Sequence, residues 1–292
     1  MKKTQNNSQS LKRVVVIGSA GFVGNALIRE LQKQALPHLG INREHIDLSS
    51  KDAVNVLTAI LEPTDRVIAA AAIAPCRTNQ DLIKNMIIAQ TIVESLKTAE
   101  VEQVINIGSD AIYADTLDFI DEDSLIGPDS IHGIMHLARE QMFKSVENIP
   151  LVFLRPTLLY GVNDPHNGYG PNQFLRLVEA GKDIVLFGDG EEMRDHVYIN
   201  DLAKLTIELV KRKSEGILNI VSGQAYPFKE IAENIIRITN THSKIISVSR
   251  KGPMPHQGLR KFRQHALKKL MPEFIYTNLI SGLQEVWHQK KI

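Results

Sequence analysis

A run of glycines near the N-terminus has the spacing of a phosphate-binding turn. Gly18, Gly21 and Gly24 follow the apolar stretch 14–17 and precede an amphipathic stretch. This order predicts a strand, a turn and a helix: Gly18 makes the tight turn, Gly21 lets the backbone approach a phosphate, and Gly24 lets the helix pack on the strand. Because the free N–H groups at a helix start bind anions, the turn predicts a dinucleotide site. The alternative is a purely structural glycine turn.

Three further polar residues have types and positions suited to chemistry on a carbonyl or hydroxyl group. Ser109 follows an apolar stretch that ends at residue 107. If that stretch is a strand, the serine hydroxyl is placed to hydrogen-bond a substrate carbonyl. His132 and His136 are four residues apart, and side chains at this spacing share one face of a helix. Because imidazole titrates near neutral pH, His132 is a candidate carrier of a proton.

The segment that begins at Asn42 bears on the choice of cofactor. In dinucleotide-binding folds an acidic residue after the second strand binds the ribose hydroxyls of NAD, whereas an arginine accommodates the extra phosphate of NADP. Asn42 and Arg43 occupy this place. They favour NADP, with NAD as the alternative; in a third interpretation Arg43 merely lies in a solvated turn.

Short apolar stretches alternate with helical ones over the first 160 residues. Strands are expected at 13–17, 38–42, 66–70, 104–107 and 151–154. Helices are expected at 22–35, 51–61, 79–99 and 130–146, with Ser49 or Ser50 as the N-cap of the second. This alternation predicts a Rossmann-type, doubly wound α/β fold whose parallel sheet is covered on both faces. Ligands of such sheets bind beyond the carboxyl ends of the strands.

The composition changes after about residue 160, where glycine and proline become frequent. We therefore expect a dinucleotide-binding domain over 12–160 and a smaller substrate-binding lobe over 161–292 that is interleaved with the end of the sheet. The polar segment 1–11 has no apolar core and is expected to be a disordered tail.

The overall composition excludes several classes of partner. The chain has 34 basic and 33 acidic residues, a formal net charge of +1. This balance gives no electrostatic case for nucleic acid or a membrane surface, and no stretch approaches the ~18 apolar residues of a membrane span. A single cysteine, Cys76, fits a reducing compartment. We expect a cytoplasmic protein.

Over residues 12–285 the chain resembles the extended short-chain dehydrogenases/reductases, the NAD(P)-dependent epimerase/dehydratase family that acts on nucleotide sugars. The shared segments are the glycine turn 18–24, the alanines 69–72, the turn 109–113, and the segments 154–156, 160–161, 170–172, 187–190 and 194–201. Segment 42–48 is also similar to GDP-fucose synthases, which use NADPH, so the resemblance favours NADP as well. It implies these cofactor-binding residues: Gly18, Ala20, Gly21, Phe22, Val23, Asn42, Arg43, Asp47, Leu48, Ala70, Ala71, Asn85 and His136.

The chain departs from this family at the catalytic pair. The family places Tyr-x-x-x-Lys on this helix, the tyrosine as general acid/base and the lysine as its positively charged helper that also binds the nicotinamide ribose. Here His132 stands at the tyrosine position and His136 at the lysine position. The resemblance implies that Ser109, His132 and His136 form the catalytic set, with His136 donating a hydrogen bond to the ribose.

Three interpretations of the histidine pair stay open. The first is a rewired hydride-transfer site, since two imidazoles beside Ser109 retain the capacity to move a proton. The second is a catalytically inactive fold that still binds nucleotides. The third is a metal site, because Glu140 continues the same helix face, although no fourth ligand is evident.

For Glu140 the alternative is a salt link or solvation. For Asn85 the alternatives are a buried hydrogen-bonding residue and a surface residue.

The resemblance also implies a substrate site and an assembly. Asn172 and Arg194 would contact the diphosphate and nucleoside of a nucleotide sugar, and Arg260 is a looser match. The planar guanidinium group suits phosphate because it pairs with two oxygens at once. The alternative for Arg194 is an internal ion pair with Asp195 that orders the loop. The family often pairs the helices that match 79–99 and 130–146, so we expect a homodimer.

Overall fold

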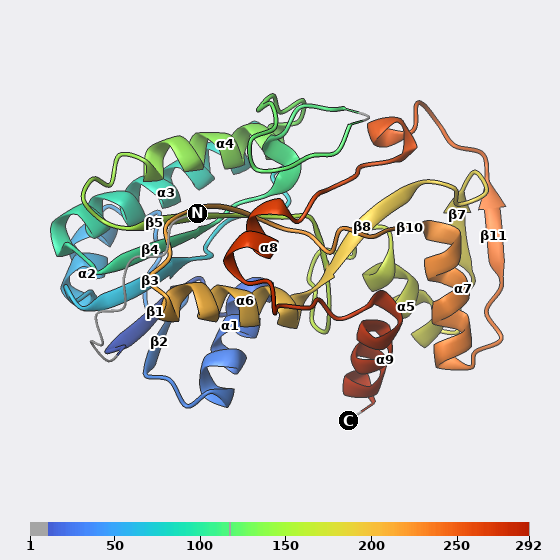
Figure 1. Cartoon of the computed structure of the whole chain (residues 1–292), viewed down its shortest axis with the longest axis horizontal. Coiled ribbons are helices and arrows are strands. Elements are labelled where there is room, and N and C mark those ends of the chain that lie inside the picture. The colour runs from blue at the N-terminus through green and yellow to red at the C-terminus, as the bar shows by residue number, and fades with distance from the viewer. Residues whose placement is uncertain (1–10, 117, 292) are drawn as a thin grey trace.

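The central element of the chain is a six-stranded parallel sheet. The structure, a computed structural model, describes residues 11–116 and 118–291 (Figure 1). The expected tail over 1–11 therefore lies almost entirely outside the described residues. The strand order is β2-β1-β3-β4-β5-β9, and every neighbouring pair is parallel. The strands are β1 (Arg13–Ile17), β2 (His38–Ile41), β3 (Asp65–Ala69), β4 (Gln103–Ile107), β5 (Leu151–Pro156) and β9 (Gly216–Ile220).

Alternation of side chains along β1 explains why both faces of the sheet are covered. Successive residues of a strand point to opposite faces. Val14 and Val16 pack into a core with α1 (Phe22–Lys33) and α6 (Ile199–Lys211). Val15 and Ile17 pack into a second core with α2 (Ala53–Ile60) and α3 (Asn79–Ala99). Figure 1 shows α2, α3 and α4 (Ile131–Phe143) along one face and α1 and α6 along the other. The Rossmann-like α/β fold expected from the sequence is confirmed.

A smaller region, largely C-terminal, lies beyond the carboxyl ends of the main strands (Figure 1). It contains a three-stranded sheet in the order β10-β8-β6 and a parallel pair of β7 and β11. Its strands are β6 (Leu158–Tyr160), β7 (Ile184–Phe187), β8 (Met193–Tyr198), β10 (Ala225–Pro227) and β11 (Ile245–Val248). The helices and helical turns not yet named are η1 (Asp110–Ile112), α5 (Pro171–Glu179), α7 (Phe228–Thr239), η2 (Pro255–Gly258), α8 (His265–Leu270) and α9 (Leu279–Lys290).

The ends of several elements differ from the sequence-based expectation by a few residues. Helix α1 ends at Lys33 because Ala35 adopts a left-handed conformation with φ of 51°. The expected cap of α2 is wrong: Asp52 is the N-cap residue, while Ser50 only offers its carbonyl to the N–H of Ala53. Within the described ranges, no helix combines the length and apolar character needed to cross a bilayer.

Candidate functional site

The glycine turn between β1 and α1 has the conformation expected from its spacing. Gly18 has φ of +91°, and a Cβ there would lie 2.6 Å from the backbone nitrogen of Ala71. A Cβ at Gly24 would lie 2.1 Å from the carbonyl oxygen of Gly18, so the close packing of helix on turn requires glycine. At Gly21 the nearest atom to such a Cβ is 3.3 Å away, and no side chain caps α1. The helix N-terminus beside Gly21 is thus left for an anionic ligand.

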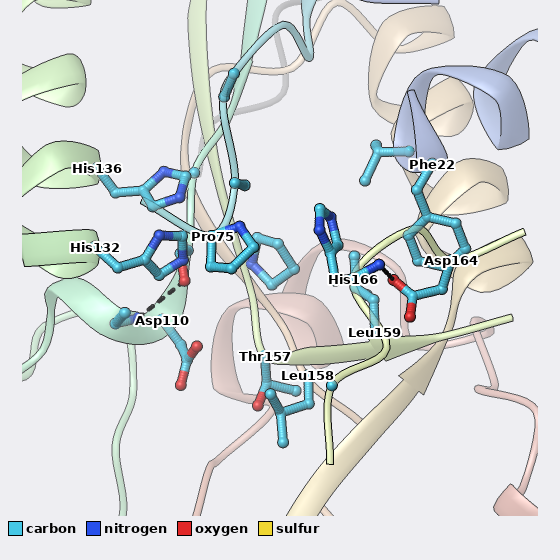
Figure 2. A pocket seen from close by; sticks show the side chains of 18 of the residues that line it. Phe22, Pro75, Asp110, His132, His136, Thr157, Leu158, Leu159, Asp164 and His166 are labelled. Carbon is cyan, nitrogen blue, oxygen red and sulfur yellow. Dashed lines mark hydrogen bonds between the residues drawn. The ribbon is translucent and has the colours of Figure 1, made fainter. Parts of the chain in front are cut away.

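A cavity of about 760 Å³ runs from this turn to the smaller region. The end of β4 and the N-terminal half of α4 form one wall. Figure 2 shows His132 and His136 together on one side, and His166, Asp164 and Phe22 on the other. Ten of the residues proposed from the sequence line this one cavity: Gly21, Phe22, Val23, Ala70, Ser109, His132, His136, Asn172, Arg194 and Arg260.

Ser109 lies where β4 ends and the turn η1 begins. Its backbone is extended, and its Oγ accepts a hydrogen bond from the N–H of Ala111 at 3.2 Å. The residue is largely buried, yet it lines the cavity. The hydroxyl also lies within hydrogen-bond reach of the Asp110 carboxylate, whose pKa this contact lowers, although burial of Asp110 outweighs that effect and raises the pKa.

The two histidines share the cavity face of α4. Ser130 caps this helix by accepting from the N–H of Gly133, which fixes where the first turn begins. The two imidazole rings are perpendicular, with centroids 4.6 Å apart. Nδ1 of His132 accepts a hydrogen bond from the backbone N–H of Cys76 at 3.2 Å. Nδ1 of His136 is buried without a hydrogen-bond partner.

Burial keeps both histidines neutral. It lowers the pKa of His132, and the nearby His166 lowers it further. Burial also places the pKa of His136 well below its ordinary value, and the charges of His132 and Arg139 act in the same direction. A lysine in place of His136 would carry a full positive charge near neutral pH. The His136 ring, whose neutral form is favoured by burial, supplies no such charge to the site.

Glu140 does not join the two histidines. Its carboxylate accepts from Nε and Nη2 of Arg155 at 3.0 and 2.8 Å. The interpretation of Glu140 as part of a salt link is confirmed, and the metal hypothesis loses its third ligand. Within the part of the chain that the structure describes, no cluster of three or more histidine, cysteine, aspartate or glutamate side chains has the arrangement of a metal site.

A second cavity of about 380 Å³ opens on the other side of the glycine turn. Asn42 lines it, but its Oδ1 accepts from the N–H of Glu44 at 2.9 Å and thereby orders its own turn. Arg43, Asp47 and Leu48 follow in the same loop and line neither cavity. The lining of this second cavity contains no acidic side chain: Ser19, Ala20, Asn25, Ile28, His38, Leu39, Gly40 and Asn42.

Asn85 is a buried hydrogen-bonding residue that orders the loop after β3. Its Oδ1 accepts from the N–H of Ile73 at 2.8 Å, and its Nδ2 donates to the carbonyls of Ile73 and Asp81. The surface alternative for Asn85 is wrong. Because this loop carries Cys76, Asn85 supports the backbone that holds His132.

The proposed substrate residues line the cavity, but much of their hydrogen-bonding capacity is used internally. Asn172 accepts from the N–H of Gly161 at 3.0 Å and donates to the carbonyl of Leu159 at 3.2 Å. Arg260 pairs with Asp110 and Asp115 at 3.0 and 3.1 Å. The Arg260 contacts join segments about 150 residues apart, whereas Asn172 orders the nearby segment 159–161.

Arg194 forms an ion pair, but not with its neighbour. Its Nη2 lies 2.5 Å from Glu192 and donates to the carbonyl of Pro255 at 2.7 Å. The alternative pairing with Asp195 is wrong, because side chains of adjacent residues on β8 point to opposite faces. The Asp195 carboxylate instead accepts from Ser222 and from the N–H of Gly223.

Asp110, His166 and His196 are among the cavity residues that were missed in the sequence. Asp110 holds Arg260 in place and follows Ser109 directly, so its position beside a named motif was a usable signal. His166 and His196 also line the cavity. His166 lies in an irregular loop rich in glycine and proline, and no periodicity could place its side chain.

The comparisons with known proteins agree with the fold. The NAD dependent epimerase/dehydratase family matches residues 14–221, more than half of the chain. The chain belongs to this family.

Curated relatives are distant but match most of the chain. A UDP-N-acetyl-alpha-D-glucosaminuronate decarboxylase of Bacillus cytotoxicus is 25% identical over 279 residues, 84% of this chain and 86% of the relative. GDP-L-fucose synthase 1 of Arabidopsis thaliana is 26% identical over 263 residues, 82% and 81% of the two chains. Among solved structures, MoeE5 in complex with UDP-glucose and NAD superposes with a TM-score of 0.81 at 22% identity, over 96% of this chain and 99% of the other.

Proposed function

We propose that the protein is an NAD(P)-dependent oxidoreductase or epimerase that acts on a nucleotide-linked sugar. The observation that carries this proposal is the single cavity that joins the glycine turn, Ser109 with the two histidines, and Arg194 of the smaller region. Hydride transfer requires that the dinucleotide and the nucleotide sugar bind next to each other. In this cavity the glycine turn would bind the dinucleotide, and the smaller region would bind the nucleotide sugar.

Different residues of the cavity would bind the cofactor and the substrate. The turn at Gly21 and the N-terminus of α1 would hold the pyrophosphate of the cofactor. When bound, the nicotinamide group supplies or accepts a hydride. Ser109 and His132 lie at the same wall and would hold the reacting sugar oxygen. His136 would contact the nicotinamide ribose, and Arg194 would contact the diphosphate with the donors left free by its internal bonds.

The relatives support this class of substrate. Their names and bound ligands include UDP-glucose, a UDP-linked uronate and a GDP-linked sugar. The test is to incubate the protein with reduced or oxidised dinucleotide and a panel of UDP-, GDP- and dTDP-linked sugars. Turnover should appear as a change in nicotinamide absorbance or, for epimerisation, as a new sugar in the proton NMR spectrum. Failure of all three nucleotide classes to bind at millimolar concentration would refute the nucleotide-sugar proposal.

The residues expected to bind the adenosine part of the dinucleotide favour NADP. The second cavity beside the glycine turn lacks an acidic side chain among its lining residues, so nothing there repels a 2′-phosphate. The exposed Arg43 lies in the adjoining loop. Arg43→Ala should weaken NADPH binding about 10-fold, since a hydrogen bond to a charged group is worth about 1.5–3 kcal/mol. NADH binding should change little; equal loss for both, or a parent that prefers NADH, would favour NAD.

A second candidate is a nucleotide-sugar-binding protein without catalysis. The observation that favours it is the buried histidine pair, whose neutral form is favoured, at the positions where the resemblance expects a tyrosine and a lysine. This candidate predicts tight binding of dinucleotide and nucleotide sugar with no conversion across the whole panel. Conversion of any one sugar would exclude it.

We also propose a homodimer and a cytoplasmic location. Ile83 and Ile87 on α3 and Ile134 on α4 are exposed on neighbouring helices, which suits an apolar contact between two copies. Ile87→Asp should yield monomers in analytical ultracentrifugation. Leu125→Asp, an exposed position off these helices, is the control. The single, unpaired cysteine is compatible with a reducing compartment.

A further inference from the structure

The ring of His132 is held by backbone from a different part of the chain. The N–H of Cys76, in the loop after β3, donates to Nδ1 of His132 at 3.2 Å. No side chain in the described part of the molecule makes a hydrogen bond to this ring. A backbone amide is always a donor and never an acceptor through its nitrogen. Nδ1 must therefore present its lone pair to Cys76.

This contact selects one tautomer of the neutral ring. A neutral imidazole carries one proton, and when Nδ1 is the acceptor that proton is on Nε2. Protonating Nδ1 would set two N–H groups against each other. Losing the Nε2 proton would leave an imidazolate anion. Neither change suits a ring that must exchange a proton during turnover.

We propose that His132 binds the reacting sugar oxygen as a neutral hydrogen-bond donor, through Nε2–H, and does not act as the general acid/base. This inference rests on the proposed function, because it assumes that a sugar oxygen reaches this wall of the cavity. The Ser109 hydroxyl would turn from Asp110 to the same oxygen and become the second donor. A neutral imidazole can polarise a carbonyl without giving up its proton.

The surroundings of the ring agree with this role. Titratable groups of the cavity lining include His136 on the same helix, Asp129 just before that helix, Arg77 next to Cys76, Asp110 in η1 and His166 in the facing loop. The Asp110 carboxylate is engaged by Arg260 and by the Ser109 hydroxyl. Burial and His166 lower the pKa of His132, so the cation is disfavoured.

If His132 keeps its proton, a reduction must take the proton from elsewhere. The carbonyl carbon of the sugar would accept a hydride supplied by the bound cofactor, and the electron pair of the C=O bond would move to oxygen. A solvent water would protonate that oxygen, and the resulting hydroxide would leave to bulk solvent. His132 begins and ends the step as the same neutral tautomer.

The first test reads the tautomer without turnover. ¹⁵N NMR of histidine-labelled protein, with the His132 signals assigned by their loss in His132→Gln, should show a non-protonated Nδ1 and a protonated Nε2 at pH 7. The pattern should persist through pH 6. A protonated Nδ1, or a ring that becomes imidazolium near pH 6.5, would overturn the proposal. This result holds even if no nucleotide sugar is converted, so the two proposals fail separately.

The second test separates donation from proton transfer. His132→Gln keeps a side-chain N–H donor but cannot titrate, whereas His132→Phe keeps a ring and removes the donor. We expect kcat/KM of the glutamine variant within about 3-fold of the parent, and a loss of about 3- to 10-fold in the phenylalanine variant, as for one neutral hydrogen bond. If both variants lose about 10²–10⁴-fold, and the parent shows a histidine titration that both lack, His132 is the acid/base and the proposal is wrong.

Discussion

Glu140 and Arg155 form a bidentate ion pair between α4 and β5, behind the residues that line the cavity. Nε of Arg155 lies 3.0 Å from Oε1 of Glu140, and Nη2 lies 2.8 Å from Oε2. Nη1 of the same arginine donates to the hydroxyl of Tyr113, which in turn donates to Asn219. The pair thus ties α4, which carries both histidines, to β5 and β9 of the main sheet and to the end of η1.

Breaking this pair should destabilise the fold. In Glu140→Gln the buried guanidinium of Arg155 loses its counter-charge, and breaking a buried pair costs about 3–5 kcal/mol. Urea unfolding followed by circular dichroism measures the change. Glu208→Gln, in the exposed pair with Lys211, is the matched control and should change stability by less than about 1 kcal/mol. Equal unfolding midpoints for the two variants would contradict the structural role of Glu140.

The glycine turn can be tested without disturbing the fold. Gly21 has φ of −73°, an ordinary conformation for any residue, and a Cβ there would lie 3.3 Å from the carbonyl oxygen of Gly18, so a side chain requires only a small local shift. Gly21→Asp places a negative charge where the pyrophosphate must approach, and calorimetry should show at least a ~10-fold loss of NADPH affinity. Gly21→Ala adds the same Cβ without the charge, and its loss of NADPH affinity should be smaller. Parent-like affinity in the aspartate variant would mean that the turn is only structural.

Much of the fold could be predicted from the sequence because buried parallel strands are short and apolar. Val14 to Ile17 are fully buried on both faces of the sheet, and such a stretch has few other interpretations. Helix ends were less predictable. The end of α1 depends on the left-handed conformation of Ala35, and nothing in the residue type indicates it.

The site was predictable where a sequence motif fixes the backbone. It was unpredictable where contacts form between residues that are distant in the sequence. Gly18 and Ser109 follow strand ends, so their positions come from local order. The pairing of Arg260 with Asp110 joins residues 150 positions apart. Likewise, the donor to His132 is a backbone N–H from another loop, and no pattern of residue types reveals a backbone contact.

Arg194 should anchor the diphosphate of the substrate. Arg194→Ala should weaken binding of UDP, GDP or dTDP, whichever the parent binds, by about 10-fold, since a charge-assisted hydrogen bond is worth about 1.5–3 kcal/mol. Arg250→Ala is the control, because Arg250 also pairs with Glu192, at 2.7 Å, but does not line the cavity. Titration calorimetry of the cofactor-bound protein measures both. Equal losses in the two variants would show that Arg194 acts only by ordering Glu192.

His196 should make stability depend on pH. Both of its ring nitrogens are buried, and burial lowers its pKa to about 3 despite a backbone contact with Arg194. The unfolded chain takes up the proton below about pH 6.5 while the folded ring stays neutral, so stability falls as the pH drops from 6.5 towards 3. At pH 5 this loss is about 2 kcal/mol. His196→Phe preserves the ring contact with Phe228 and removes the titrating group. Its free energy of unfolding should therefore fall by about 2 kcal/mol less than that of the parent between pH 7 and pH 5. His242→Phe, at an exposed position, is the matched control, and a parent-like pH slope in His196→Phe would refute the prediction.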